Sequence, residues 1–231
     1  MLGLFDSGSG GLNTVRCLKE LAPRIDLVYK IDREHSPYGI KSKKELIGII
    51  EGNIDELIDR GAEKILIACC TASALHGELT DYHRAVSIPI ISAVASAADT
   101  ATENGKIGVL ATAGTVRSHA FARALPERTV FEREAQELVG LIDGGLTDGS
   151  VTPYHEELLR RLVTPLAGRN IDTLILGCTH FPALYHSFAR VCHPLGIKNV
   201  IDSAKIGAMT LSEIAEKNER KKKWQITDEE E

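Results

Sequence analysis

Two cysteines of this sequence lie in closely similar settings, where an apolar run gives way to small residues. Cys69 follows the run 64–68 (KILIA), and Cys178 follows the run 172–177 (DTLILG). A thiol that ionises is a base and a nucleophile, and the amino end of a helix favours the thiolate. A single free cysteine is more often a buried apolar residue. The recurrence of the setting is what favours chemistry at both positions.

An internal repeat determines which cysteines correspond. The segment GAEKILIACCTASA (61–74) resembles NIDTLILGCTHFPA (170–183), and matching the apolar runs aligns Cys69 with Cys178. This alignment leaves Cys70 opposite Thr179. A rival alignment pairs Cys70-Thr71 with Cys178-Thr179, but it displaces the two apolar runs. We prefer the first alignment and expect Cys69 and Cys178 to be equivalent.

A second pair of segments extends the repeat. MLGLFDSGSGG (1–11) resembles KIGVLATAGT (106–115), since each is an apolar run that enters a loop of small residues. Ligands of open parallel sheets bind beyond the carboxyl ends of the strands. We therefore expect Asp6, at the end of the first run, to face the same cleft as Cys69. The glycines of this loop match neither a dinucleotide-binding loop nor a P-loop.

Two further motifs carry polar groups. In GCTHFP (177–182), His180 follows Cys178 by two residues, which suits a nucleophile and its base. In DREHSPYGIKS (32–42), we expect Pro37-Tyr38-Gly39 to form a turn with an exposed aromatic hydroxyl.

Short apolar runs alternate with helical patterns along the chain, which predicts parallel βαβ units. The expected strands are 2–5, 26–31, 64–68, 89–92, 106–111, 129–132, 172–176 and 198–201. The expected helices are 11–21, 42–60, 72–84, 93–103, 115–124, 135–143, 153–168, 181–192 and 204–219.

The predicted fold is α/β, with two pseudo-symmetric flavodoxin-like domains and the active site in the cleft between them. Each domain has a mostly parallel sheet flanked by helices. We expect residues 1–94 and 205–231 to form the first domain and residues 95–204 the second. The boundary is expected near 92–98, and the last helix is expected to pack back on the first domain.

Composition excludes several other classes of protein. The chain has 231 residues and a net charge of −5, from 27 Lys and Arg against 32 Asp and Glu. We therefore expect no nucleic-acid partner. The sequence has neither an apolar run of membrane-spanning length nor a recognisable leader, so we expect a cytoplasmic protein without a membrane partner. The five cysteines lack the spacing of a disulfide framework or a zinc site, so we expect free thiols and no metal.

Six motifs in order resemble the glutamate racemases, within the cofactor-independent aspartate/glutamate racemase family. They span residue 3 to about residue 203. These motifs are FDSGSGGL, PYGIKS, ACCTASA, IGVLATAGTVRS, LILGCTHFP and VIDSA.

The resemblance implies a racemase that interconverts L- and D-glutamate without cofactor and supplies D-glutamate for bacterial peptidoglycan. One cysteine would remove the α-proton and the other would return a proton to the opposite face. It implies Cys69 and Cys178 as these catalysts, with Asp6 assisting the first and His180 the second. Asp143 corresponds to a further family carboxylate, in a stretch that aligns poorly. The implied substrate-binding residues are Asp6, Ser7, Tyr38, Gly39, Cys70, Thr71, Thr115, Thr179 and His180. A homodimer is a candidate assembly.

Some positions depart from the family pattern. Cys70 stands where the family has asparagine, and His35 where arginine is common. Residues 224–231 resemble a segment near the carboxyl end of the family members. We expect the closing helix that follows this segment in the family to be missing here. Two alternatives follow from these departures. One is a racemase for aspartate or for a broader set of amino acids, and the other is a degenerate member that binds acidic amino acids without catalysis.

Overall fold

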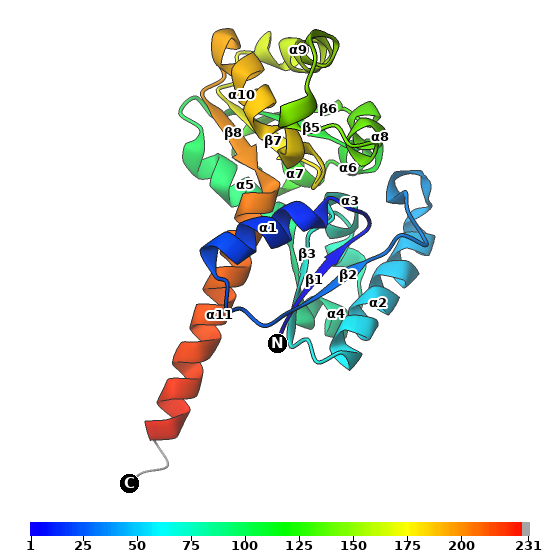
Figure 1. The fold of residues 1–231 in the computed structure, drawn as a ribbon, viewed down its shortest axis with the longest axis vertical. Coiled ribbons are helices and arrows are strands. Elements are labelled where there is room, and N and C mark those ends of the chain that lie inside the picture. The colour runs from blue at the N-terminus through cyan, green and yellow to red at the C-terminus, as the bar shows by residue number, and fades with distance from the viewer. Residues whose placement is uncertain (228–231) are drawn as a thin grey trace.

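The structure is a computed structural model that describes residues 1–227, with side chains described through residue 218. It contains two four-stranded parallel sheets with the same strand order, β2-β1-β3-β4 and β6-β5-β7-β8. Figure 1 shows the sheets in two lobes, each flanked by helices. The predicted α/β fold with two matching halves is confirmed. Among the described residues, no helix has both the length and the apolar character needed to cross a bilayer.

The strands lie close to the predicted runs. The first sheet comprises β1 (Leu2–Asp6), β2 (Leu27–Ile31), β3 (Lys64–Ile67) and β4 (Ser87–Pro89). The second sheet comprises β5 (Lys106–Ala111), β6 (Thr129–Glu134), β7 (Thr173–Gly177) and β8 (Asn199–Asp202). Every residue of β1 and of β7 is buried, as expected for central strands of a parallel sheet that is covered on both faces.

The helices connect these strands and cover the sheets. Those up to the start of β5 are α1 (Gly11–Leu21), α2 (Lys43–Asp59), α3 (Cys70–Ser73), α4 (Asp81–Val86) and α5 (Ile90–Ala101). Those that follow β5 are α6 (Ala113–Ser118), α7 (Ala120–Ala124), α8 (Glu137–Asp143), α9 (Pro153–Ala167), α10 (Tyr185–Cys192) and α11 (Ser203–Thr227). Short 3-10 helices span Tyr38–Ile40, His76–Glu78, Asp148–Ser150, Phe181–Leu184 and His193–Leu195.

The long helices follow from local sequence. In α2, the Ser42 hydroxyl caps the amino end by accepting a bond from the Glu45 N–H at 3.3 Å. Leu46, Ile50 and Leu57 recur at helical spacing and are buried against the first sheet. In Figure 1, α11 runs from the second lobe down beside α1. The last helix thus contacts the first half through α1.

Three predicted elements were wrong in extent. The strand expected at 89–92 ends at Pro89, and Ile90 begins α5, because a short apolar run fits a buried helix as well as a strand. The helix expected at 72–84 is broken into α3, a 3-10 turn and α4, which Thr80 caps. The helix expected at 115–124 is interrupted by His119, whose φ of 50° is left-handed.

The region 92–98, where the domain boundary was expected, lies within α5. This helix is not a linker on the surface. Val94, Ala95 and Ala98 are buried in a core cluster that also contains residues of both sheets, among them Leu4 and Val109. Residues 228–231, the end of the expected first domain, lie outside the described part of the chain.

Candidate active site

Loops at the carboxyl ends of the strands enclose a cavity of about 80 Å³. This is room for several water molecules or one small solute. Its walls come from both halves of the molecule. They are formed by Ser7, Ser36, Pro37, Tyr38, Gly39, Cys69, Cys70, Thr71, Thr112, Gln136, Val139, Asp143, Gly177, Cys178, Thr179 and His180. The cleft predicted between the halves is therefore present, and both cysteines of the repeat line it.

The sheet registers show that Cys69 and Cys178 are structurally equivalent. Gly3 of β1 pairs with Ile65 of β3, and Gly108 of β5 pairs with Leu174 of β7. Cys69 follows Ile65 by four positions, and Cys178 follows Leu174 by four positions. The preferred alignment of the repeat is confirmed, since the rival alignment would place Cys70 opposite Cys178.

Cys69 lies directly before α3, and its sulfur is 3.0 Å from the Ser7 hydroxyl. Burial raises the pKa of the Cys69 thiol to about 11, and the nearby charge of Asp6 adds to this increase. The expected stabilisation of a thiolate by a helix terminus was wrong. The helix α3 has only four residues, so it carries little of the dipole that a longer helix provides.

Cys178 follows β7, and its sulfur lies 3.6 Å from Nδ1 of His180. The other ring nitrogen, Nε2, is 3.2 Å from Oδ1 of Asp143. Burial raises the pKa of the Cys178 thiol, and only a weaker opposing effect comes from the backbone N–H of His180. Cys178, His180 and Asp143 therefore form a chain of polar groups that leads from the cavity toward its partly exposed rim.

Asp6 is fully buried and does not line the cavity. Burial raises the pKa of its carboxyl to about 6, and the opposing effect of the His180 imidazole is smaller. Oδ1 accepts a bond from the Gly8 N–H at 3.1 Å, whereas Oδ2 has no hydrogen-bond partner. The expectation that Asp6 faces the cleft was wrong. Because β1 is buried throughout, its last side chain lies behind the cavity wall and acts on Cys69 through its charge.

Three threonine hydroxyls form a cluster where the halves meet. Oγ1 of Thr71, from the first half, is 2.9 Å from that of Thr112 and 3.2 Å from that of Thr115. Thr112 and Thr115 are 3.1 Å apart. Thr71 and Thr112 line the cavity, whereas the predicted Thr115 is buried behind them. Each hydroxyl both donates and accepts, so the cluster retains capacity for another partner.

Tyr38 differs from its prediction. Tyr38 lines the cavity, but its side chain is buried and its hydroxyl donates to Asp32 at 2.7 Å. Asp32 also accepts from Asn53 at 3.0 Å and lies 2.9 Å from Nδ1 of His35. The expected exposed hydroxyl was therefore wrong. The Asp32 network holds the segment Ser36–Gly39 in place as one wall of the cavity.

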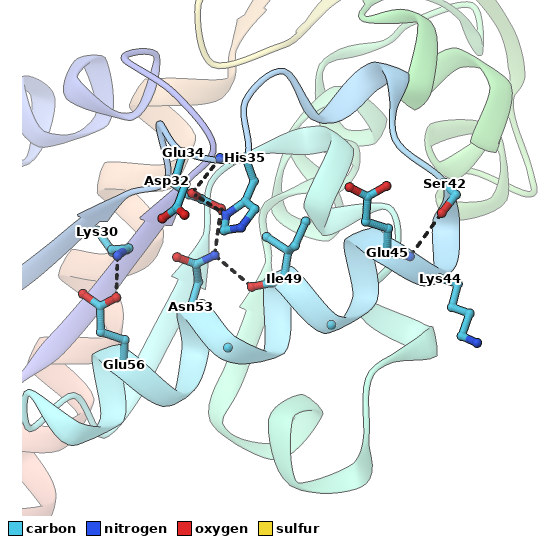
Figure 2. A pocket seen from close by; sticks show the side chains of 12 residues that line it. Lys30, Asp32, Glu34, His35, Ser42, Lys44, Glu45, Ile49, Asn53 and Glu56 are labelled. Atoms are coloured by element: carbon cyan, nitrogen blue, oxygen red, sulfur yellow. Dashed lines mark hydrogen bonds and ion pairs between the residues drawn. The ribbon is translucent and has the colours of Figure 1, made fainter.

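Figure 2 shows the part of this network formed by Asp32, His35 and Asn53, which lines a larger groove of about 710 Å³ between β2 and α2. Lys30 forms an ion pair with Glu56 across the groove. No cysteine lines this groove, and its lining residues include Gly48 and Gly52, which have no side chain. The smaller cavity is the candidate active site because it holds both equivalent thiols.

Sequence reasoning missed part of the cavity wall. Gln136 and Val139 enter it from the segment that follows β6, which also carries Asp143, a residue that the family resemblance had indicated. The rule that ligands bind beyond strand ends, applied to this strand as well, would have indicated the segment. Among the described residues, no group of three or more His, Cys, Asp or Glu side chains is arranged to hold a metal ion.

Comparisons with known proteins agree with this geometry. The family model "Asp/Glu/Hydantoin racemase" matches residues 13–211. A glutamate racemase of Desulforudis audaxviator is 40% identical over 198 residues, which cover 84% of this chain and 71% of the relative. The structure of a Bacillus anthracis glutamate racemase superposes with a TM-score of 0.81 at 31% identity, covering 94% of this chain and 82% of that one. A Francisella tularensis glutamate racemase, solved in complex with D-glutamate, gives a TM-score of 0.80 at 28% identity, covering 94% and 81% of the two chains.

Proposed function

This chain belongs to the Asp/Glu/Hydantoin racemase family, and from that premise we propose that it is a glutamate racemase, an isomerase that interconverts L- and D-glutamate. The observation that carries the proposal is the pair of cysteines at equivalent positions of two matching sheets, both lining one cavity. Inversion at a carbon requires a base on one face and an acid on the other. A duplicated half-molecule supplies one thiol for each role.

In the proposed mechanism, the thiolate of one cysteine takes the α-proton of glutamate and becomes a thiol. The thiol of the other cysteine gives its proton to the opposite face of the α-carbon and becomes a thiolate. The opposite enantiomer reverses these roles. Asp6 assists Cys69 through its charge, and His180 assists Cys178 from 3.6 Å. No cofactor enters this mechanism.

The raised pKa values require a base for each thiol. Cys69, with a pKa of about 11, holds its proton at neutral pH, and burial raises the pKa of Cys178 as well. Asp6, with a pKa of about 6, is mostly ionised at pH 7. We therefore propose that each thiolate forms only transiently. Asp6 serves as the base for Cys69, and a neutral His180 serves as the base for Cys178.

The remaining wall residues are proposed to bind the substrate. Ser7, whose hydroxyl is 3.0 Å from the Cys69 sulfur, and Thr71 and Thr179 of the cavity wall are proposed to bind the carboxylates of glutamate. Tyr38 and Gly39 also line the cavity, and the Thr115 hydroxyl lies 3.2 Å from that of Thr71. The thiol of Cys70, also in the wall, is a weaker hydrogen-bond donor than an amide.

We further propose the biological setting. The enzyme would supply D-glutamate for peptidoglycan synthesis in the cytoplasm, as a homodimer without a nucleic-acid or membrane partner. Its domains would be residues 1–94 with 205–231, and residues 95–204. The shared strand order of the sheets and the packing of α11 on α1 support this division.

A racemisation screen tests the substrate. Purified protein is incubated separately with each enantiomer of glutamate, aspartate and other amino acids, and chiral chromatography follows inversion. Glutamate is expected to be inverted with the highest kcat/KM. A higher value for aspartate or another amino acid would overturn the substrate assignment, and no inversion at all would favour a non-catalytic binder.

The variant Cys70→Asn sharpens this screen. An asparagine amide adds donors in the cavity wall, so KM for glutamate is expected to fall roughly tenfold. The variant Cys17→Ser, at a thiol outside the cavity wall, serves as the control.

A further inference from the structure

Ser9 forms a contact between the two halves beside the proposed active site. It lies in the loop that follows β1, and its hydroxyl donates to Oδ1 of Asp143 at 2.6 Å, across 134 positions of sequence. The same hydroxyl is 3.4 Å from Nε2 of His180. Ser9 does not line the cavity, so it does not contact a solute bound there.

We propose that Ser9 is a positioning residue that holds Asp143 against His180 and thereby fixes the proton arrangement of His180 beside Cys178. The proposal rests on the proposed racemase function and adds to it a residue that none of the sequence motifs assigned. Its basis is a set of three distances among Ser9, Asp143 and His180.

The chemistry of the three groups fixes their roles. An ionised Asp143 only accepts hydrogen bonds, so Nε2 of His180 must carry a proton to bond with it at 3.2 Å. A neutral imidazole has one N–H, which leaves Nδ1 as a bare acceptor that faces the Cys178 thiol at 3.6 Å. This arrangement is the one in which His180 can take the proton of Cys178.

Asp143 needs such support because it lies at the rim. Its side chain is 49% exposed, whereas that of His180 is 8% exposed. Without the Ser9 hydroxyl, the carboxylate could rotate into water and release Nε2. The hydrogen bond from Ser9 changes neither the charge nor the burial of Asp143 or His180, so its effect is on their geometry.

The loop that carries Ser9 is itself held against the second half. Asn13 donates from Nδ2 to the carbonyl of Thr179 at 2.9 Å. A Cβ atom on Gly10 would lie 2.8 Å from the backbone nitrogen of His180, so the loop already contacts this backbone. The position of Ser9 relative to His180 is therefore set by Gly10 of the same loop and by Asn13 in the first turn of α1.

This arrangement predicts an asymmetric effect. Ser9 supports the Cys178 side, whereas Cys69 has its own partners in Ser7 and Asp6. A variant at Ser9 should therefore slow proton abstraction by Cys178 more than abstraction by Cys69.

The test compares Ser9→Ala, Ser9→Thr and the control Ser212→Ala, which lies on α11 away from the cavity. We expect Ser9→Ala to lower kcat/KM roughly tenfold, because a bond to a charged group is lost, and Ser9→Thr to restore most of it. The α-deuterium isotope effect on kcat/KM should rise for the enantiomer that Cys178 deprotonates and fall for the other. Equal changes in the isotope effects of the two enantiomers would overturn the proposal. So would an unchanged kcat/KM in Ser9→Ala, or a kcat/KM that Ser9→Thr does not restore.

A second measurement does not depend on turnover. The ¹⁵N chemical shifts of the His180 ring, identified by comparison with His180→Asn, report which nitrogen is protonated. The wild type should show the proton on Nε2, and Ser9→Ala should show a mixture of both forms. If the wild type fails to racemise glutamate but shows this shift, the proposed function fails and the role of Ser9 stands. If the ring is unchanged in Ser9→Ala, the role of Ser9 fails even in an active enzyme.

Discussion

At the scale of the residue, burial dominates the chemistry of this site. Cys69 and Cys178 are each 6% exposed, and burial is the largest cause of the raised pKa of both thiols. The same cause raises the pKa of Asp6 to about 6. The cavity thus holds acids that keep their protons to a higher pH than they would in water, so each thiol needs a base close by to lose its proton.

The variant Asp6→Asn tests this view through stability. The folded protein holds the Asp6 proton up to about pH 6, whereas the unfolded chain releases it near its ordinary value of 3.8. Stability therefore falls as pH rises from about 4 to 6 and stays lower above that range. The asparagine cannot ionise, so urea unfolding should show the variant gaining about 2–3 kcal/mol relative to wild type between pH 4 and pH 7. A difference that is constant across this range would contradict a raised pKa at Asp6.

The same variant has an expected effect on activity. The ionised carboxylate is the form proposed to assist Cys69, so kcat/KM of the wild type should fall as pH drops through about 6. Asp6→Asn should lose this inflection and reduce kcat/KM at pH 8 by about tenfold or more. Asp26→Asn, at an aspartate away from the cavity, is a suitable control.

At the scale of the element, the loops after the strands carry the site. The loop after β1 contacts both halves, since Ser7 lies near Cys69 and Ser9 contacts the second half, as does Asn13 at the start of α1. Gly10 lies between them with an ordinary right-handed backbone, φ −57° and ψ −36°. It is therefore space, and not conformation, that requires glycine there.

The variant Gly10→Ala tests that close approach. The added Cβ would meet the Thr179 hydroxyl and lie 2.7 Å from the Thr179 carbonyl carbon, so the backbone of one half must shift. We expect a loss of about 1–3 kcal/mol in the free energy of unfolding and a large fall in kcat/KM. The matched control is Gly48→Ala in α2, where nothing lies within 4 Å of the new atom. It should gain about 0.5–1 kcal/mol and keep its activity. Equal effects of the two variants would contradict a close contact at Gly10.

At the scale of the whole molecule, the sequence predicted the topology better than the packing. Apolar runs closed by small residues indicated most strands, and the repeat around Cys69 and Cys178 indicated two equivalent halves. The helix expected at 42–60 is likewise present as α2, where Leu46 and Ile50 recur at helical spacing and are buried. These features are local, so a single sequence can reveal them.

Features that depend on contacts between distant segments were not predictable in this way. The Tyr38 hydroxyl is buried because it contacts Asp32, which follows β2, and Asn53 of α2, and the spacing of these residues in the sequence does not reveal the contact. Asp6 lies behind the wall because it still belongs to β1, which is buried along its whole length. The contact of Ser9 with Asp143 joins two halves and leaves no local pattern.

The central claim is that two thiols, one from each half, exchange the α-proton of glutamate on opposite faces. Its most direct test is ¹H NMR of L-glutamate, and separately of D-glutamate, with the protein in D₂O. We expect the wild type to replace the α-proton by deuterium from either enantiomer, while Cys69→Ser and Cys178→Ser each abolish racemisation. Retained racemisation in either serine variant, or no exchange from either enantiomer in the wild type, would contradict the account.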